Sequence, residues 1–327
     1  MNARTLATTM MNAAKPAELT HSFDAILMLA LNGHVVEAFH SLNDALTAAR
    51  AVATPEVWQR LVQLARQHHL CELVQRDPFT RRCFAKPRGY SGDATALDYV
   101  LQSEPKTKRP HEIEAQLHFC TTQGALARGL RFRRDHIAGA IDAIAFAAPR
   151  PITVFSVAGG HLREIERMRA FKAGKIARFA AFDTDSENLE RVLADYARLP
   201  VAARPGTLRQ LISGKHFFED MDVIYVAGLM EMLDDGTARG LVRSLFTMLK
   251  PGGSLILTNF LESMPEAAYA ETYMDWPMNY RSQLKLFGWL QDVGPESAAW
   301  SYGENEESSM GALTIQRKPA PGAANPP

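Results

Sequence analysis

The feature that most constrains the fold is a change of pattern at Pro149-Arg150-Pro151. After these prolines, short apolar runs alternate with helical segments, whereas the chain before them has mostly helical spacing. Proline disfavours helical geometry in the residue before it, so a helix is expected to end here. Strands that alternate with helices build βαβ units and a mostly parallel sheet. The pattern therefore predicts an α/β sheet with helices on both faces, preceded by a helical region.

Individual elements can be placed from apolar spacing and from turn residues. Phe23, Ile26, Leu27 and Ala30 recur at helical intervals. Thr54 followed by Pro55 is typical of a helix start. A further helix is expected over about 161–171. Strands are expected over 152–157, 178–182, 207–212, 223–227 and 254–259, with a closing hairpin of 298–302 and 312–316.

These elements predict three parts of the chain. Residues 1–150 form a helical domain, and residues 151–318 form the sheet domain. Residues 319–327 are rich in Pro, Ala and Gly and are expected to be a disordered tail.

Composition excludes several classes of function. Lys plus Arg and Asp plus Glu are 36 each, so the formal net charge is zero. A neutral chain has no overall attraction to nucleic acid or to an anionic membrane. Cys71, Cys83 and Cys120 form no C-x-x-C pair, which disfavours a disulfide framework and a thiolate metal site. No signal peptide or run of about 20 apolar residues is present, so a cytoplasmic protein is expected. The oligomeric state stays open.

A turn of small residues, Ser156 to Gly160, follows the first expected strand. Such a turn lets the backbone approach a ligand and leaves helix N–H groups facing its anionic end. Asp183 ends the second expected strand, where a carboxylate can accept hydrogen bonds from ribose hydroxyls. A plain tight turn and a helix cap are the alternatives for these two features. The turn lacks the G-x-G-x-x-G spacing of dinucleotide sites.

Two later features follow in order. Asp222 to Tyr225 opens the fourth expected strand, and Leu249-Lys250-Pro251-Gly252-Gly253 precedes the fifth. The succession resembles the class I methyltransferases that use S-adenosylmethionine (SAM), over about Ile152 to Arg317. This resemblance implies a Rossmann-like sheet that binds SAM, as substrate or methyl donor, and needs no metal. The residues that it places at SAM are Ser156, Ala158, Gly159, Gly160, Glu164, Asp183, Thr184, Ile212, Ser213, Gly228 and Leu229.

A narrower resemblance rests on motifs spread over the chain. They are the segments 76–82, 86–93, 133–135 and 274–277, with Tyr280-Arg281. The set is similar to a branch labelled for hydroxypalmitate methyl ester biosynthesis. That branch includes enzymes that cyclise SAM to azetidine-2-carboxylate and release methylthioadenosine. The resemblance implies an enzyme of small-molecule, secondary metabolism.

Three functions follow from this resemblance. The expected reaction is cyclisation of SAM, because Ser156 stands where class I methyltransferases usually carry Asp or Glu. A carboxylate there would stabilise the ammonium of SAM, whereas cyclisation needs the neutral amine. Glu164 is the residue that can supply the missing charge and so weaken this interpretation. The alternatives are methyl transfer to a small molecule, such as a hydroxy fatty acid carboxylate, and a non-catalytic SAM-binding regulator.

The expected catalytic residues are aromatic or polar. Tyr90, Trp276 and Tyr280 are candidates for holding the sulfonium by cation–π attraction, with core packing as the alternative for Trp276. Arg134, together with Arg133, can bind a carboxylate, or the pair covers an exposed helix face. Asn259 ends the fifth expected strand, where ligand crevices open in such sheets. The helical domain is expected to act as a lid over the site.

Overall fold

The protein is described by a computed structural model that covers residues 16–102, 111–214, 218–294 and 296–319. Residues 320–327 of the expected tail lie outside this part. The chain divides into two compact units. The first unit comprises Met1–Leu130 and Met264–Met278, and the second comprises Arg131–Ser263 and Asn279–Pro327.

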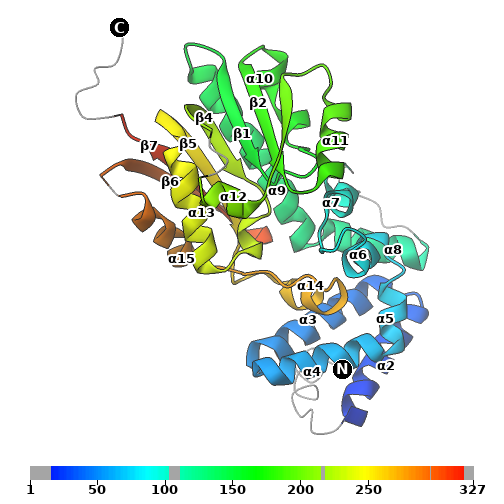
Figure 1. Cartoon of the computed structure of the whole chain (residues 1–327). Coiled ribbons are helices and arrows are strands. Elements are labelled where there is room, and N and C mark those ends of the chain that lie inside the picture. Colours follow the sequence, from blue (N-terminus) through cyan, green and yellow to red (C-terminus); the bar gives the residue numbers. More distant parts are fainter. Residues whose placement is uncertain (1–15, 103–110, 215–217, 295, 320–327) are drawn as a thin grey trace. The chain divides into compact units, whose positions relative to one another are not determined.

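The first unit is helical (Figure 1). The spacing predicted for its first helix is confirmed, because Phe23, Ile26 and Ala30 are all buried. Thr54 caps a helix through its side chain, with Pro55 in the first turn, also as predicted. The helices of this unit are α2 (Pro16–Leu31), α3 (Val35–Val52), α4 (Pro55–Gln67), α5 (His69–Val74), α6 (Pro78–Ala85), α7 (Ala94–Leu101), α8 (Ile113–Gln123) and α14 (Ala267–Tyr273).

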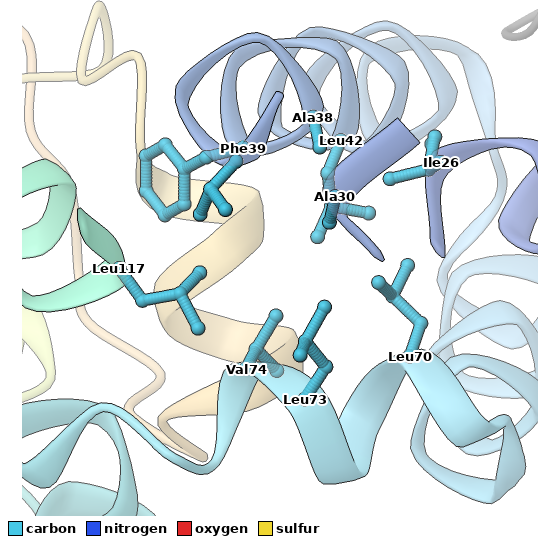
Figure 2. A pocket seen from close by; sticks show the side chains of 10 residues that line it. Ile26, Ala30, Ala38, Phe39, Leu42, Leu70, Leu73, Val74 and Leu117 are labelled. Atoms are coloured by element: carbon cyan, nitrogen blue, oxygen red, sulfur yellow. The ribbon is translucent and has the colours of Figure 1, made fainter. Parts of the chain in front are cut away.

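An apolar pocket lies inside this helical unit. Figure 2 shows side chains from α2, α3, α5 and α8 around it, among them Ile26, Leu42, Leu73 and Leu117. None of its ten lining residues has a polar side chain. The pocket is therefore a gap in a hydrophobic core and offers no group that could perform chemistry.

The second unit contains a seven-stranded sheet with the order β3-β2-β1-β4-β5-β7-β6. The first five strands pair in parallel, and β7 is antiparallel to both β5 and β6. The α/β prediction and the closing hairpin are thus confirmed. The strands are β1 (Ile152–Val157), β2 (Ile176–Asp183), β3 (Val201–Pro205), β4 (Met221–Val226), β5 (Leu249–Phe260), β6 (Ala298–Asn305) and β7 (Met310–Arg317).

Helices cover both faces of the sheet, as predicted. Neighbouring residues of a strand point to opposite faces, so the two faces contribute to two separate cores. On one face, Val223 and Tyr225 pack with α9 (Ala125–Ala147) and α11 (Ser186–Asp195). On the other, Ile224 and Val226 pack with α13 (Asp235–Thr247) and α15 (Gln283–Gly288). Strand β4 is buried along its whole length, as expected for a central strand of a covered sheet.

Helix α9 crosses from one unit to the other. It begins in the first unit, and its residues Ile137, Ile141 and Ala145 belong to the core beneath the sheet. The sequence places the division at residue 150, after this helix, whereas the compact units divide within it at Leu130. The segment Met264–Met278 also returns the chain to the first unit.

The predicted third strand is wrong. Residues 207–212 begin with Thr207, whose side chain and that of Gln210 form a reciprocal cap at the start of α12 (Leu208–Ile212). This capping pattern favours helix. The third strand is instead β3, which lies at the edge of the sheet and is only partly buried.

The helix predicted over 161–171 is also wrong. Leu162 has a φ of 53° and so leaves the right-handed helical region. The chain then forms a short 3₁₀ turn, η1 (Ile165–Arg167), followed by the short helix α10 (Arg169–Lys172). Tyr196 holds the irregular stretch in place by donating a hydrogen bond to the Leu162 carbonyl at 3.1 Å.

Candidate functional site

The turn after β1 has an unusual backbone. Ala158 and Gly160 have φ angles of 52° and 59°, in the left-handed region. An added Cβ on Gly159 would lie 2.3 Å from both Ser156 Oγ and Leu162 Cδ2, so a larger residue there would force these side chains to shift. The Ala158 N–H donates to the Phe182 carbonyl at 2.8 Å, which ties the turn to the end of β2. The expected small-residue turn therefore lies at the carboxyl edge of the sheet.

Asp183 lies next to this turn, at the end of β2. Its carboxylate is buried and accepts from the Asp185 N–H at 2.9 Å and from Asn188 Nδ2 at 3.3 Å. Burial raises the pKa of Asp183, while these hydrogen bonds oppose the shift. The backbone of Gly160 also acts to lower the pKa of this carboxyl, so the turn lies close to it. The following residue, Thr184, is exposed.

Glu164 supplies a second buried carboxylate near the turn. The Tyr225 hydroxyl on β4 donates a hydrogen bond to its Oε1. Tyr225 is the register partner of Ser156 on the neighbouring strand, so Glu164 reaches the region of Ser156 through this phenol. Burial raises the pKa of Glu164, and the Tyr225 hydrogen bond and the charges of Arg133 and Arg134 oppose the shift.

Arg133 and Glu231 form a buried ion pair beside the end of β4. Arg133 Nη1 lies 2.9 Å from Glu231 Oε1, and both side chains are at most 5% exposed. The guanidinium lies against Gly228, whose φ is 85°, and a Cβ there would come within 2.9 Å of Nη1. Gly228 and the partly buried Leu229 directly follow the strand. Arg134 is also buried, and its Nε donates to Asp135 at 2.7 Å.

Asn259 lies at the end of β5, and its side chain is engaged by protein groups. Its Nδ2 donates to the Phe260 and Asn279 carbonyls, and its Oδ1 accepts from Arg281 Nη1 at 2.8 Å. Arg281 is buried and also bonds the Met230 carbonyl. This network fixes the loops after β4 and β5. Tyr280 is half-buried in the same unit.

Two of the expected aromatic residues belong to the first unit. Tyr90 is 40% exposed. Trp276 is 5% exposed and packs against Gly92, where a side chain would collide with the indole ring. Ser91 Oγ donates to the Asp275 carbonyl at 2.7 Å, which holds the Tyr90 loop against this segment.

Ile212 and Ser213 lie at the carboxyl end of helix α12, away from the position that a third strand would give them. Ile212 packs against the core, and Ser213 Oγ donates to the Gln210 carbonyl at 3.3 Å. Gly206, which directly follows β3, is the residue that contacts the end of β2: its N–H donates to the Asp183 carbonyl at 3.1 Å.

The sequence missed Tyr225 and Glu231 as site residues. Tyr225 reads as part of an apolar strand, and Glu231 follows the strand in a short 3₁₀ turn, η2 (Met230–Met232). No local pattern distinguishes them, because Glu164, the partner of Tyr225, is 61 residues away in the sequence, and Arg133, the partner of Glu231, is 98 residues away.

Within the described residues, no group of three or more His, Cys, Asp or Glu side chains is arranged to hold a metal ion. None of the described helices combines the length and the apolar character needed to span a membrane.

No protein-family model matches the chain, and no curated protein sequence matches it. Among solved structures, a possible exported protein from Bordetella parapertussis is 14% identical, with a TM-score of 0.63, and the match covers 78% of this chain and 88% of that one. An O-methyltransferase family protein from Burkholderia thailandensis is 16% identical, with a TM-score of 0.44 and coverage of 69% and 68%. The SAM-bound amino pentose methyltransferase CalS10 from Micromonospora echinaspora is 13% identical, with a TM-score of 0.43 and coverage of 57% and 92%.

The strand order decides the fold. Five parallel strands are followed by an antiparallel β7 inserted between β5 and β6. The fold is that of a class I methyltransferase. In this methyltransferase fold, the turn after β1, Asp183 and the end of β4 share the carboxyl edge of the sheet, which is where ligands bind in open α/β sheets.

Proposed function

We propose that this chain is a SAM-dependent methyltransferase that acts on a small molecule. The observation that carries the proposal is the 2.8 Å hydrogen bond from the Ala158 N–H to the carbonyl of Phe182, the residue before Asp183. It joins the glycine turn of β1 to the acidic end of β2, the two features that a nucleoside with a ribose requires. The equal numbers of acidic and basic residues favour a small acceptor over a nucleic acid.

The residues present fit SAM. Asp183 has carboxylate oxygens available to ribose hydroxyls, since a carboxylate offers about four acceptor sites and protein groups use only part of them. Gly159 and Gly160 allow close backbone approach. Glu164 can accept hydrogen bonds from the ammonium group. When bound, SAM supplies a methyl group made electrophilic by the sulfonium.

Glu164 favours methyl transfer over cyclisation. The neutral side chain of Ser156 is the feature of the sequence that favours cyclisation. Glu164, linked to Tyr225 beside Ser156, brings a carboxylate back to this region. A carboxylate beside the SAM amine stabilises the ammonium form, which has no lone pair and cannot attack carbon. Methyl transfer tolerates that protonated amine.

Cyclisation is the second candidate, because burial raises the pKa of Glu164. A protonated Glu164 would not hold the ammonium, and Ser156 would then leave the amine neutral. In this reaction the amine nitrogen attacks its own Cγ and the Cγ–S bond breaks. The sulfur leaves as methylthioadenosine, and one proton passes from nitrogen to solvent.

Product analysis tests these functions. Purified protein is incubated with SAM alone and with a panel of small acceptors that includes hydroxy fatty acids, and the products are identified by mass spectrometry. Methyl transfer predicts S-adenosylhomocysteine only when an acceptor is present. Methylthioadenosine and azetidine-2-carboxylate from SAM alone would instead establish the cyclase. Unchanged SAM under all conditions would favour a non-catalytic SAM-binding protein.

A further inference from the structure

The buried ion pair of Arg133 and Glu231 is incompletely satisfied. Arg133 Nη1 donates to Glu231 at 2.9 Å, and its guanidinium makes no other hydrogen bond to the described residues. Glu231 Oε2 is buried and has no partner among them. Burying two charges is costly unless the remaining donors and acceptors are also used. The remaining N–H groups of Arg133 can therefore donate to an acceptor on a ligand.

The pair lies at the candidate SAM site. Gly228 lies against the guanidinium: its φ of 85° favours glycine, and an added Cβ would lie 2.9 Å from Nη1 and 3.2 Å from Cζ. The charge of Arg133 also acts on Glu164. The guanidinium is therefore beside the end of β4 and near the carboxylate that follows the turn of β1.

Charge complementarity identifies the ligand group. The Arg133 cation beside the end of β4 and the Glu164 carboxylate near it offer opposite charges to the two ends of a zwitterionic amino acid. An arginine fork matches the geometry of a carboxylate.

We infer that Arg133 binds the α-carboxylate of SAM and that Glu231 is a positioning residue that holds the guanidinium in place. The inference rests on the proposed function, because it assigns residues to the same ligand. Beyond that function, it assigns to one ion pair the preference for ligands that carry the α-carboxylate. Glu231 fixes Arg133 from the side of η2, and Gly228 leaves room for the guanidinium.

Binding of three ligands by calorimetry tests this inference on the full chain. S-adenosylhomocysteine carries the complete amino acid, S-adenosyl-3-thiopropylamine lacks only its carboxylate, and methylthioadenosine lacks the whole amino-acid part. The Arg133→Gln variant is expected to lose about tenfold or more in affinity for S-adenosylhomocysteine, the size of one charge-assisted contact. Its affinities for the other two ligands should stay unchanged. Glu231→Gln should show the same selective loss, but smaller, because the arginine is retained.

Two further variants separate recognition from folding. The Arg133→Gln/Glu231→Gln double variant removes both charges together, so that neither remains buried without its partner, and it should show the same selective loss. Asp222→Asn is the matched control. Asp222 is a buried carboxylate at the opposite end of β4, where it accepts from the Thr153 N–H at 2.8 Å. This control should lower the melting temperature without changing the ratio of the three affinities.

An equal loss for all three ligands in the double variant, or no loss for any, would overturn the role of Arg133. An unchanged ratio in Glu231→Gln would overturn the positioning role of Glu231. If the wild-type protein binds neither S-adenosylhomocysteine nor methylthioadenosine, the proposed function is overturned, and the inference with it.

Discussion

Asp183 is the residue on which nucleoside binding is expected to depend most. Asp183→Ala removes the acceptor for the ribose hydroxyls, and two hydrogen bonds of about 1 kcal/mol each correspond to a loss of roughly tenfold to a hundredfold in affinity. Calorimetry with S-adenosylhomocysteine measures this loss. Asp185→Ala is the control, because the Asp185 side chain caps α11 through the Glu187 N–H. Equal affinities in the two variants would show that Asp183 does not face the ligand.

Glu164 predicts a pH dependence of stability. Burial holds the pKa of Glu164 above the ordinary value of 4.5. Below that value the carboxyl is protonated in both the folded and the unfolded chain, so it has no effect. As the pH rises, the unfolded chain ionises first and the free energy of unfolding falls.

Glu164→Gln removes this titration while keeping an acceptor for the Tyr225 hydroxyl. The melting temperature of this variant should therefore rise relative to that of the wild type as the pH increases above about 4.5. Thermal unfolding of both proteins across a pH series measures the difference. Curves that stay parallel would contradict the assignment.

At the scale of single elements, Gly159 in the turn after β1 and Gly139 in α9 can each be replaced by alanine, the second substitution serving as control for the first. Gly159 lies in the turn after β1, where a side chain would collide with Ser156 and Leu162. Gly159→Ala is expected to destabilise the protein by about 1–3 kcal/mol, as overpacked sites do. It should also weaken S-adenosylhomocysteine binding, because the turn must shift. A normal ligand affinity in this variant would mean that the turn does not approach the ligand.

Gly139 is exposed within α9, and an added Cβ meets no atom within 4 Å. Gly139→Ala is expected to stabilise the protein by about 0.5–1 kcal/mol, because alanine loses less backbone entropy than glycine when a helix forms. Thermal or urea unfolding measures this gain. Ligand affinity should stay at the wild-type value, which makes this variant the control for Gly159→Ala.

At the scale of the whole molecule, the course of α9 decides which fragment of the chain can fold. A fragment of residues 151–327 lacks Ile137, Ile141 and the other α9 residues of the sheet core. Their burial contributes on the order of 5 kcal/mol, which is comparable to the total stability of many domains. This fragment is therefore expected to be unfolded, as measured by circular dichroism.

A fragment of residues 131–327 retains these core residues. Its segment 264–278, which belongs to the first unit, can be replaced by a short Gly/Ser linker, because the Glu262 N–H bonds the Arg281 carbonyl at 3.3 Å and so holds the two ends together. This fragment should fold and bind S-adenosylhomocysteine. Cooperative unfolding of the 151–327 fragment would show that α9 is dispensable for the sheet.

The sequence by itself determined the elements whose signal is local. Buried strands such as β1 and β4 are rich in apolar residues, and the turn at Ser156 to Gly160 is recognisable from its small residues. The edge strand β3 was missed because it is only partly buried and so has no apolar run to mark it. The irregular segment around Leu162 was missed because its φ of 53° is stabilised by Tyr196, a residue distant in sequence.

Only the tertiary structure decided how the site is charged. The sequence offered neutral Ser156 and a candidate compensating charge in Glu164, and the fold shows that Glu164 bonds Tyr225, the register partner of Ser156. Arg133 meets Glu231 across 98 residues, and Gly228 admits its guanidinium. Such contacts depend on which strand ends share one edge of the sheet, and neither periodicity nor turn residues encode them locally.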